Sequence, residues 1–284
     1  MTDFEQPQHS KDPNWNSRGS ALSTGFPTLV SPPIVEVACG VIFDRMPGMD
    51  GISLGVYCDN SRADYPHQVL QPAVHDSPAI NINLANLPLR AVLVSNDKSR
   101  VVQLQYDRFI TTWNQVAGSA YPRFSKDAGA RSLVAEFDTE FKKLGQFCTE
   151  RFGFAPLPQK VEVVKVNILR QGTHWTDLAD LDRTLTVMGV FRRVQSTADR
   201  DVALRFAERG PAGEQLSVAV HSMPRNPGEG LHAVRLETRC TANVSGDLVA
   251  TFEDANNSVN TAFFNLISPD QLGRFGTKGG THGS

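Results

Sequence analysis

The chain has 284 residues, of which 40% are hydrophobic and 20% are charged, a composition typical of a globular protein with a sizeable core. The formal net charge of −2 argues against a generally basic surface, so we expect no nucleic-acid partner. No apolar run approaches the roughly 20 residues of a membrane-spanning helix, so we expect no membrane partner.

The N-terminal residues are predicted to form a tail. Residues 1–31 are rich in Ser, Pro, Asn, Gln and Gly, and such a segment cannot bury enough apolar surface to offset its ordering entropy. The sequence "PPIVEVACGVIF" then predicts a strand, because an extended Pro-Pro entry precedes strand-forming side chains. A weak helix is expected before Tyr65.

The next two segments predict a β-hairpin and a change of structure after it. "LRAVLVSN" and "VVQLQYDRF" are apolar runs separated by the polar turn "DKS". Residues 101–106 alternate as a strand does, whereas the apolar side chains of residues 109–116 recur at helical spacing. We therefore expect a joint between strand and helix at Asp107-Arg108.

The most regular helical pattern covers residues 131–152, where apolar side chains recur every three or four positions. Gly153 and Pro156 are expected to end this helix. "KVEVVKVNIL" predicts a strand, and "TDLADLDRTL" predicts a short helix capped by Thr176 or Asp177.

The remainder predicts a series of strands and a final helix. The strands are "TLTVMGVFRRV", "DVALRFAER", "QLSVAVHSM" and "LHAVRLETRCTANV", with turn residues between them. The last helix is expected over residues 248–267, with Pro269 after its end. Residues 276–284 are rich in Gly and predict a flexible tail.

These elements predict an α+β protein with mainly antiparallel, curved sheet covered by two long amphipathic helices. Residues 32–155 and 156–275 each contain a strand, a helix, a set of antiparallel strands and a long helix. We therefore predict two α+β halves of similar outline. Their likeness lies in the order of the elements, so an internal duplication is a hypothesis only.

Four stretches together resemble a known family. They are "PPIVEVACGVIF", "VQLQYDRFITTWNQV" followed by "YPRF", "VEVVKVNIL", and "VNTAFFNLISPDQLGRFG". In this order they are similar to a sporadically distributed bacterial family of uncharacterised proteins, over residues 32–276. Arg108 and Trp113 match the arginine and tryptophan usual at this joint in the family. The resemblance implies a bacterial source and an accessory gene, and it implies no reaction.

The sequence contains no signature of a known catalytic or cofactor site. It lacks the phosphate-binding loop, the dinucleotide-binding glycine motif and the nucleophile elbow. The four cysteines are isolated and the seven histidines have no metal-ligand spacing, so we predict no metal, no cofactor and no catalytic residue. The cysteines are expected to be buried, as in a reducing cytoplasm.

Two groups of polar residues remain as candidates. Arg108, with Tyr106 and Trp113 nearby in sequence, could bind an anionic or planar ligand, or it could instead fix a structural corner. The carboxylates of Asp177, Asp180 and Asp182 could act as acids or bind a cation, but their position at a helix start favours a capping role.

Two hypotheses about function follow. The first is a non-catalytic binding or interaction protein with a protein partner or a second copy of the chain, acting as an accessory component of a bacterial defence or mobile-element module. The alternative is a small-molecule-binding protein or an enzyme, with a cavity between the sheet and the helices. A deep pocket with converging polar groups would favour the alternative.

Overall fold

The computed structural model describes residues 26–27, 29–73, 89–117, 119, 121–125, 132–187, 203–210, 213–223 and 233–276. The elements of the first part are β1 (Ile34–Phe43), α2 (Gly51–Asn60), β2 (His67–Pro72), β3 (Leu89–Val94), β4 (Arg100–Gln105), β5 (Arg108–Asn114) and α3 (Leu133–Phe152). Those of the second part are β6 (Pro158–Arg170), α4 (Leu178–Thr184), β7 (Ala203–Arg209), β8 (Gln215–Met223), β9 (Ala233–Asn243), α5 (Leu248–Leu266) and the 3-10 helix η4 (Pro269–Phe275).

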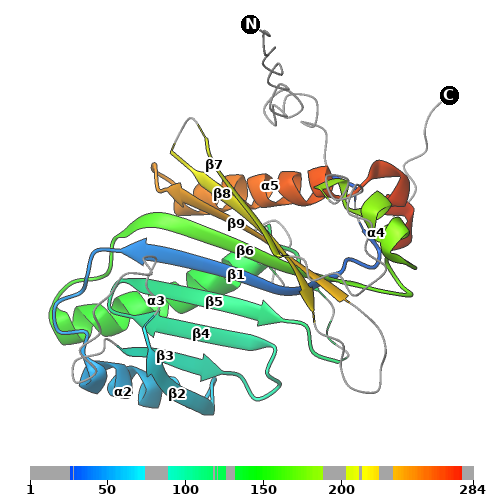
Figure 1. The fold of residues 1–284 in the computed structure, drawn as a ribbon. Helices are drawn as coiled ribbons and strands as arrows, with labels where there is room; N and C mark the ends of the chain where they lie inside the picture. The colour runs from blue at the N-terminus through cyan, green and yellow to red at the C-terminus, as the bar shows by residue number, and fades with distance from the viewer. Residues whose placement is uncertain are drawn as a thin grey trace, which may run out of the picture.

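These strands form one open, antiparallel sheet of nine strands, counted over the described residues, in the order β2-β3-β4-β5-β1-β6-β9-β8-β7 (Figure 1). The predicted α+β class and antiparallel sheet are therefore confirmed. At the centre, β1 pairs with β6 along its length, from Ile34 opposite Asn167 to Phe43 opposite Pro158. The residues before and after the predicted boundary at 155 thus share a single sheet.

One face of the sheet is covered by helices, and the other, called the helix-free face, has no helix on it among the described residues. On β1, Val37, Cys39 and Val41 join the core on the covered face, whereas Glu36 and Ala38 point to the helix-free face. Helix α3 contacts β1 and β5, and α5 contacts β6, β8 and β9. Figure 1 shows both helices behind the strands.

The core on the covered face consists of two apolar clusters. The first cluster contains Val161 and Val163 of β6 together with the buried apolar side chains of the elements from β1 to α3. The second cluster contains Leu169 of β6 together with apolar side chains of β8, β9 and the end of α5. Between the two clusters, the covered face of β6 presents Lys165 and Asn167, which are only 6% and 4% exposed. The apolar core is therefore interrupted by two buried polar side chains.

Local sequence signals set the ends of the helices. The Ser132 side chain accepts a hydrogen bond of 3.2 Å from the Ala135 amide at the start of α3. Gly153 ends this helix with φ of +82°, a left-handed conformation that glycine adopts without strain. Asp177, one of the two caps predicted for the short helix, caps α4.

The helix predicted over residues 109–116 is wrong, because this segment forms β5. Tyr106 and Asp107 form the turn that connects β4 to β5. Strand β5 pairs with β1 on one side and with β4 on the other, so it is interior to the sheet. Phe109 and Trp113 lie on the covered face and Ile110 on the other face, so apolar side chains on both faces of this strand coincided with helical spacing.

Parts of the predicted tails and of three predicted strands lie outside the described residues, namely 1–25, 28, 188–194, 201–202, 231–232 and 277–284. Within the predicted N-terminal tail, Val30 and Ser31 are described, and their amides donate hydrogen bonds to the carbonyls of Gly276 and Phe275. Across the described ranges, no helix has the combination of length and apolar character that would let it cross a membrane.

Candidate functional site: a cavity between the sheet and helix α5

A cavity of about 750 Å³ lies where the two core clusters are interrupted. Strand β6 contributes Lys165 and Asn167 to it, and α5 contributes Asn256 and Asn260. Small-molecule sites typically have volumes of about 300–1,000 Å³ and combine apolar walls with a few polar groups. The size and the composition of this cavity both fit that class of site.

Lys165 and Arg123 are the charged side chains that line the cavity among the described residues, and Lys165 is the buried one. Its Nζ donates a hydrogen bond of 2.6 Å to Asn260 Oδ1 and lies 5.4 Å from the centre of the Phe124 ring. Burial lowers the pKa of Lys165 from 10.5 to about 8, although the negative charge of Glu253 opposes this shift. The cavity therefore contains an amine that loses its proton far more readily than an ordinary lysine.

Two asparagines lie on the same face of α5, one turn apart. Asn260 accepts the hydrogen bond from Lys165, as described above. Asn256 is 6% exposed, and its Oδ1 atom is buried without a hydrogen-bond partner among the described residues. An unsatisfied buried acceptor costs about 1–3 kcal/mol, so the Asn256 side chain would be stabilised by a hydrogen-bond donor.

One wall of the cavity is apolar. Phe263 and Phe264 of α5 face the segment that carries Leu29 and Val30. Phe26 stacks on Phe264, with a centroid distance of 5.2 Å and an interplanar angle of 7°. These side chains offer a surface for an aliphatic or aromatic ligand body. Further polar side chains line the cavity away from β6 and α5, namely Ser31, Gln115, Tyr121, Arg123 and Ser125.

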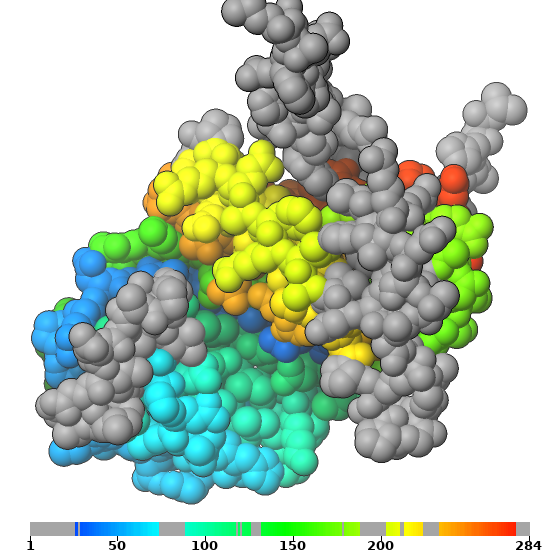
Figure 2. Space-filling view, viewed as in Figure 1, coloured from blue at the N-terminus to red at the C-terminus, as the bar shows by residue number. Residues whose placement is uncertain are grey.

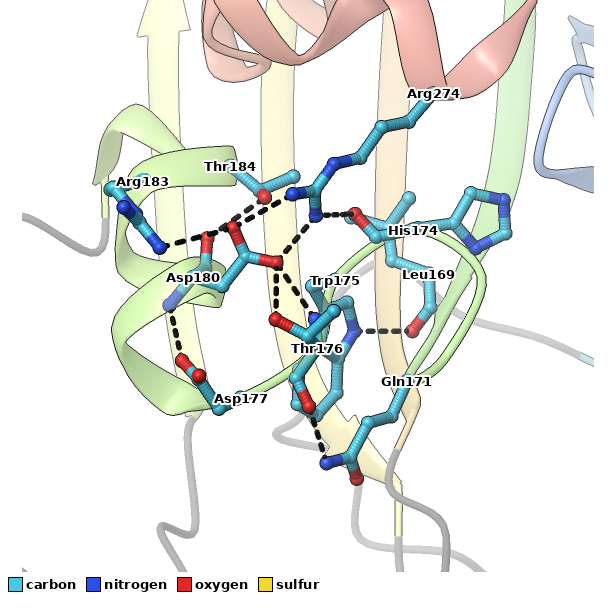
Figure 3. A network of polar contacts seen from close by, with 10 residues as sticks. All are labelled: Leu169, Gln171, His174, Trp175, Thr176, Asp177, Asp180, Arg183, Thr184 and Arg274. Carbon is cyan, nitrogen blue, oxygen red and sulfur yellow. Dashed lines mark hydrogen bonds and ion pairs between the residues drawn. The ribbon is translucent and has the colours of Figure 1, made fainter.

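A polar network holds the outer wall of the cavity in place (Figure 3). Both nitrogens at the tip of Arg274 donate to the Asp180 carboxylate, which is 1% exposed and also accepts hydrogen bonds from Thr176. Bonding to Arg274 is the main reason why the pKa of Asp180 falls to about 2. The network fixes η4, and the end of η4 in turn binds the backbone of Val30 and Ser31.

The contacts of the carboxylates in "TDLADLD" are those of helix capping and of the polar network. Asp177 Oδ1 accepts a hydrogen bond of 2.8 Å from the Asp180 amide at the start of α4. Asp180 is the centre of the network in Figure 3, and Asp182 is buried on the same helix. In the described part of the chain, no group of three or more His, Cys, Asp or Glu side chains is placed to hold a metal ion.

The structure places the predicted site residues Tyr106, Arg108 and Trp113 apart from one another. Arg108 begins β5 on the helix-free face and is 5% exposed. Trp113 lies on the covered face, is 2% exposed, and makes an edge contact with Tyr121 at 5.3 Å. The ring of Tyr106 packs beside the core, with the Arg45 guanidinium 5.2 Å from its centre.

Arg108 instead lines a groove of about 210 Å³ on the helix-free face. This groove lies in the hollow between the yellow strands β7–β8 and the cyan strands of the opposite edge (Figure 2). Within the groove, Arg239 pairs with Glu162 at 3.0 Å, and Arg235 pairs with Glu237 at 2.6 Å. Burial is the main cause that raises the pKa of Glu36, which also lines the groove.

The four cysteines are buried, as predicted, and free. Burial raises the pKa of Cys39 to about 12, an effect that the nearby charge of Lys165 reduces. A thiol with such a pKa is protonated near neutral pH, so it is a poor nucleophile. Cys39 contributes to the core beside the cavity as a small apolar side chain.

The cavity residues were not among those singled out from the sequence, although two signals point to them. In "VEVVKVNIL", Lys165 and Asn167 share one face of a strand that is otherwise apolar. In the last helix, Asn256 and Asn260 are four positions apart on the same stripe as Phe252 and Val259. Polar residues on two buried faces are expected to need partners, and here they face one another.

No family model matches the sequence, and no curated protein matches it.

Proposed function

We propose that this chain is a non-catalytic binding protein that holds a small amphipathic ligand in the cavity between β6 and α5. The observation that carries the proposal is the cavity of about 750 Å³ that Lys165 and Asn256 line from facing elements, together with the Oδ1 atom of Asn256, which is buried without a hydrogen-bond partner among the described residues. Lys165, on the facing strand, provides N–H donors to the same space. A ligand that satisfies both groups would be stabilised there.

The two polar groups define the head of the ligand. Lys165 favours an acceptor, such as a carbonyl or carboxylate oxygen, and Asn256 Oδ1 favours a donor, such as a hydroxyl group. The walls formed by Phe263, Phe264 and Leu29 favour an aliphatic or aromatic body. Hydroxy acids and related amphipathic carbonyl compounds have this combination of groups.

Thermal unfolding with a ligand panel tests the proposal. Suitable probes are octanoic acid, 3-hydroxyoctanoic acid and phenyllactic acid, with octane-diol as a polar compound that lacks the acidic head. A probe at a hundredfold excess over its Kd adds about 2.7 kcal/mol of stability. We expect the hydroxy acids to raise the Tm of the wild-type protein, and Lys165→Met and Asn256→Leu to remove this increase.

Matched controls come from the same elements. Lys160 is exposed on β6 and Asn257 is exposed on α5, so Lys160→Met and Asn257→Leu should keep the full ligand-dependent increase in Tm. If no probe raises the Tm, or if the increase is equal in Asn256→Leu and the wild type, the cavity is not the binding site.

We also propose a protein partner, or a second copy of this chain, for the helix-free face. The observation that favours this role is the groove of paired arginines and glutamates there, including Arg239 and Glu162. The accessory role in a bacterial defence or mobile-element module, in the cytoplasm, rests on the family resemblance of the sequence. Light scattering across a dilution series, with Arg239→Glu as the variant, tests whether this face joins two copies.

The two-halves hypothesis is likewise a proposal, and the strand pairing supports it. In residues 32–155 the first strand, β1, pairs with the last, β5, and in residues 156–275 the first strand, β6, pairs with the last, β9. Each half then ends in a long helix, α3 or α5. We propose that α3 and α5 occupy equivalent positions in two duplicated halves, and that the cavity formed beside the junction of the two halves.

A further inference from the structure

The surroundings of the Lys165 amine are unusual for a buried cation. The contacts that the structure gives for Nζ, within the described residues, are the Asn260 Oδ1 atom and the Phe124 ring. A buried ammonium is normally stabilised by a carboxylate within ion-pair distance, because removal from water is costly. A neutral oxygen, an aromatic ring and the nearby charge of Glu253 compensate that cost only in part, so the amine loses its proton more readily here than in water.

A neutral amine is the form of lysine that attacks carbonyl carbons. Because the pKa of Lys165 is lowered to about 8, roughly a tenth of this side chain is neutral at pH 7. That fraction is roughly 300-fold larger than for a lysine of ordinary pKa. Lysines that form Schiff bases are activated in this way, by desolvation in an apolar pocket.

We propose that Lys165 captures a small aldehyde or ketone in the cavity as a Schiff base. The inference rests on the proposed function, since it assigns the acceptor group of the ligand to a carbonyl and its capture to the lysine of the same cavity. The ligand class is a carbonyl compound with an aliphatic or aromatic body, which the walls around Phe263 and Phe264 would contact.

The reaction needs no oxidant or reductant. The Nζ lone pair forms a bond to the carbonyl carbon, and a proton passes from nitrogen to the former carbonyl oxygen, which gives a carbinolamine. The remaining proton of the nitrogen then leaves with that hydroxyl group as water, which breaks the carbon–oxygen bond, and the nitrogen lone pair forms the C=N bond. The products are the imine and one water molecule, and the reverse reaction releases the ligand.

Neighbouring groups of the cavity suit the carbinolamine. Asn256 lines the cavity, and its side-chain amide is proposed to accept the hydrogen bond of this hydroxyl group. Tyr121 lines the same cavity, and burial raises the pKa of its phenol, so this side chain remains an O–H donor. Asn256 and Tyr121 are therefore proposed as positioning residues, whereas Lys165 forms the covalent bond.

Reductive trapping tests the proposal. The full-length protein is incubated near neutral pH with substoichiometric hexanal and sodium cyanoborohydride, and the labelled positions are quantified by peptide mass spectrometry over time. We expect a hexyl adduct at Lys165 to form at least about tenfold faster than at Lys142, an exposed lysine of α3. Labelling of Lys165 at the rate of Lys142 would overturn the proposal.

The N-terminal amine provides an internal reference, because α-amino groups also have a pKa near 8. The two amines have similar pKa values, but the apolar cavity also binds the alkyl chain of hexanal. Lys165 should therefore be labelled faster than the N-terminal amine. Asn256→Leu should slow the labelling of Lys165, and the exposed control Asn257→Leu should not. Capture by the cavity would be contradicted if Lys165 is labelled no faster than the terminal amine and if its labelling rate is equal in both variants.

Failure of this inference is distinguishable from failure of the proposed function. If 3-hydroxyoctanoic acid raises the Tm but Lys165 is not selectively labelled, the cavity binds ligands without forming an imine. If the acid raises the Tm and also slows a selective labelling of Lys165 by hexanal, both the ligand binding and the imine formation are supported. If the acid does not raise the Tm and Lys165 is not selectively labelled, both the proposed function and this inference are wrong.

Discussion

Replacement of Lys165 by methionine should stabilise the ligand-free protein near neutral pH. Methionine has a similar length and fills the same space without a charge. The lowering of the Lys165 pKa from 10.5 to about 8 corresponds to about 3 kcal/mol of destabilisation of the folded state at pH values below about 8. Loss of the hydrogen bond to Asn260 offsets about 1 kcal/mol, so we expect a net gain of about 2 kcal/mol.

The gain should depend on pH with a definite sign. A folded-state pKa that is depressed makes the wild-type protein least stable below that pKa, and the loss is recovered as the pH rises toward 10.5. The advantage of Lys165→Met should therefore shrink by about 2 kcal/mol between about pH 7 and about pH 9.5. Other groups titrate in this range, but the comparison of variant with wild type cancels their contributions.

Urea unfolding of both proteins at the two pH values, followed by fluorescence, measures this difference. The exposed Lys160→Met serves as control and should show neither the gain nor its pH dependence. A Lys165→Met protein that is less stable than the wild type by the same amount at both pH values would refute the reasoning. Lys165 would then be a stabilising core residue and not one retained for binding.

Three further predictions concern the core, the cavity and the polar network. Trp113→Ala and Phe137→Ala should each lower the free energy of unfolding by about 3–5 kcal/mol, because both rings are almost fully buried, and urea titration measures the loss. Asn256→Leu removes an unsatisfied acceptor, so it should leave the stability of the ligand-free protein unchanged or raise it by up to about 1 kcal/mol in the same urea titration. A loss of stability of more than about 1 kcal/mol would show that the acceptor has a partner. Asp180→Asn should lower stability by about 1–3 kcal/mol near neutral pH. The wild-type advantage should disappear as the pH falls from 3.8 toward about 2, which acid titration of both proteins can detect, with the exposed Asp254→Asn as control.

The elements that could be predicted from the sequence are those specified by local residues. Helix α3 has its own cap at Ser132, its own stop at Gly153 and an apolar stripe of helical period between them. These signals need no information about the rest of the chain. The predicted range of 131–152 therefore agrees closely with the observed Leu133–Phe152.

The failure at β5 has the opposite cause. Its two edges pair with β4 and β1, and side chains on both of its faces are buried, with Phe109 on one side and Arg108 and Thr112 on the other. The number of neighbours that a strand has in a sheet is a tertiary property, and a short apolar run cannot reveal it. The residues predicted to form a site at this joint lie apart because the segment is a strand, in which Arg108 and Trp113 point to opposite faces.

The cavity depends on contacts between distant parts of the chain. Lys165 and Asn260 are 95 residues apart, and they meet because α5 packs over β6. Each segment contains a polar pair on an apolar face, which marks it as unusual, but neither segment specifies the other as its partner. The sheet order, with β6 at the centre beside β1, is what brings them together.

The most direct test of the binding cavity is an NMR titration of the side-chain amide groups of Asn167, Asn256 and Asn260 with 3-hydroxyoctanoic acid. If the ligand occupies the cavity, the resonances of all three amides should shift along one saturation curve, while the exposed amide of Asn257 remains unchanged. The same titration of Lys165→Met should give no saturating shifts. Three cavity amides that do not respond, or that respond no more than Asn257, would contradict ligand binding at this site.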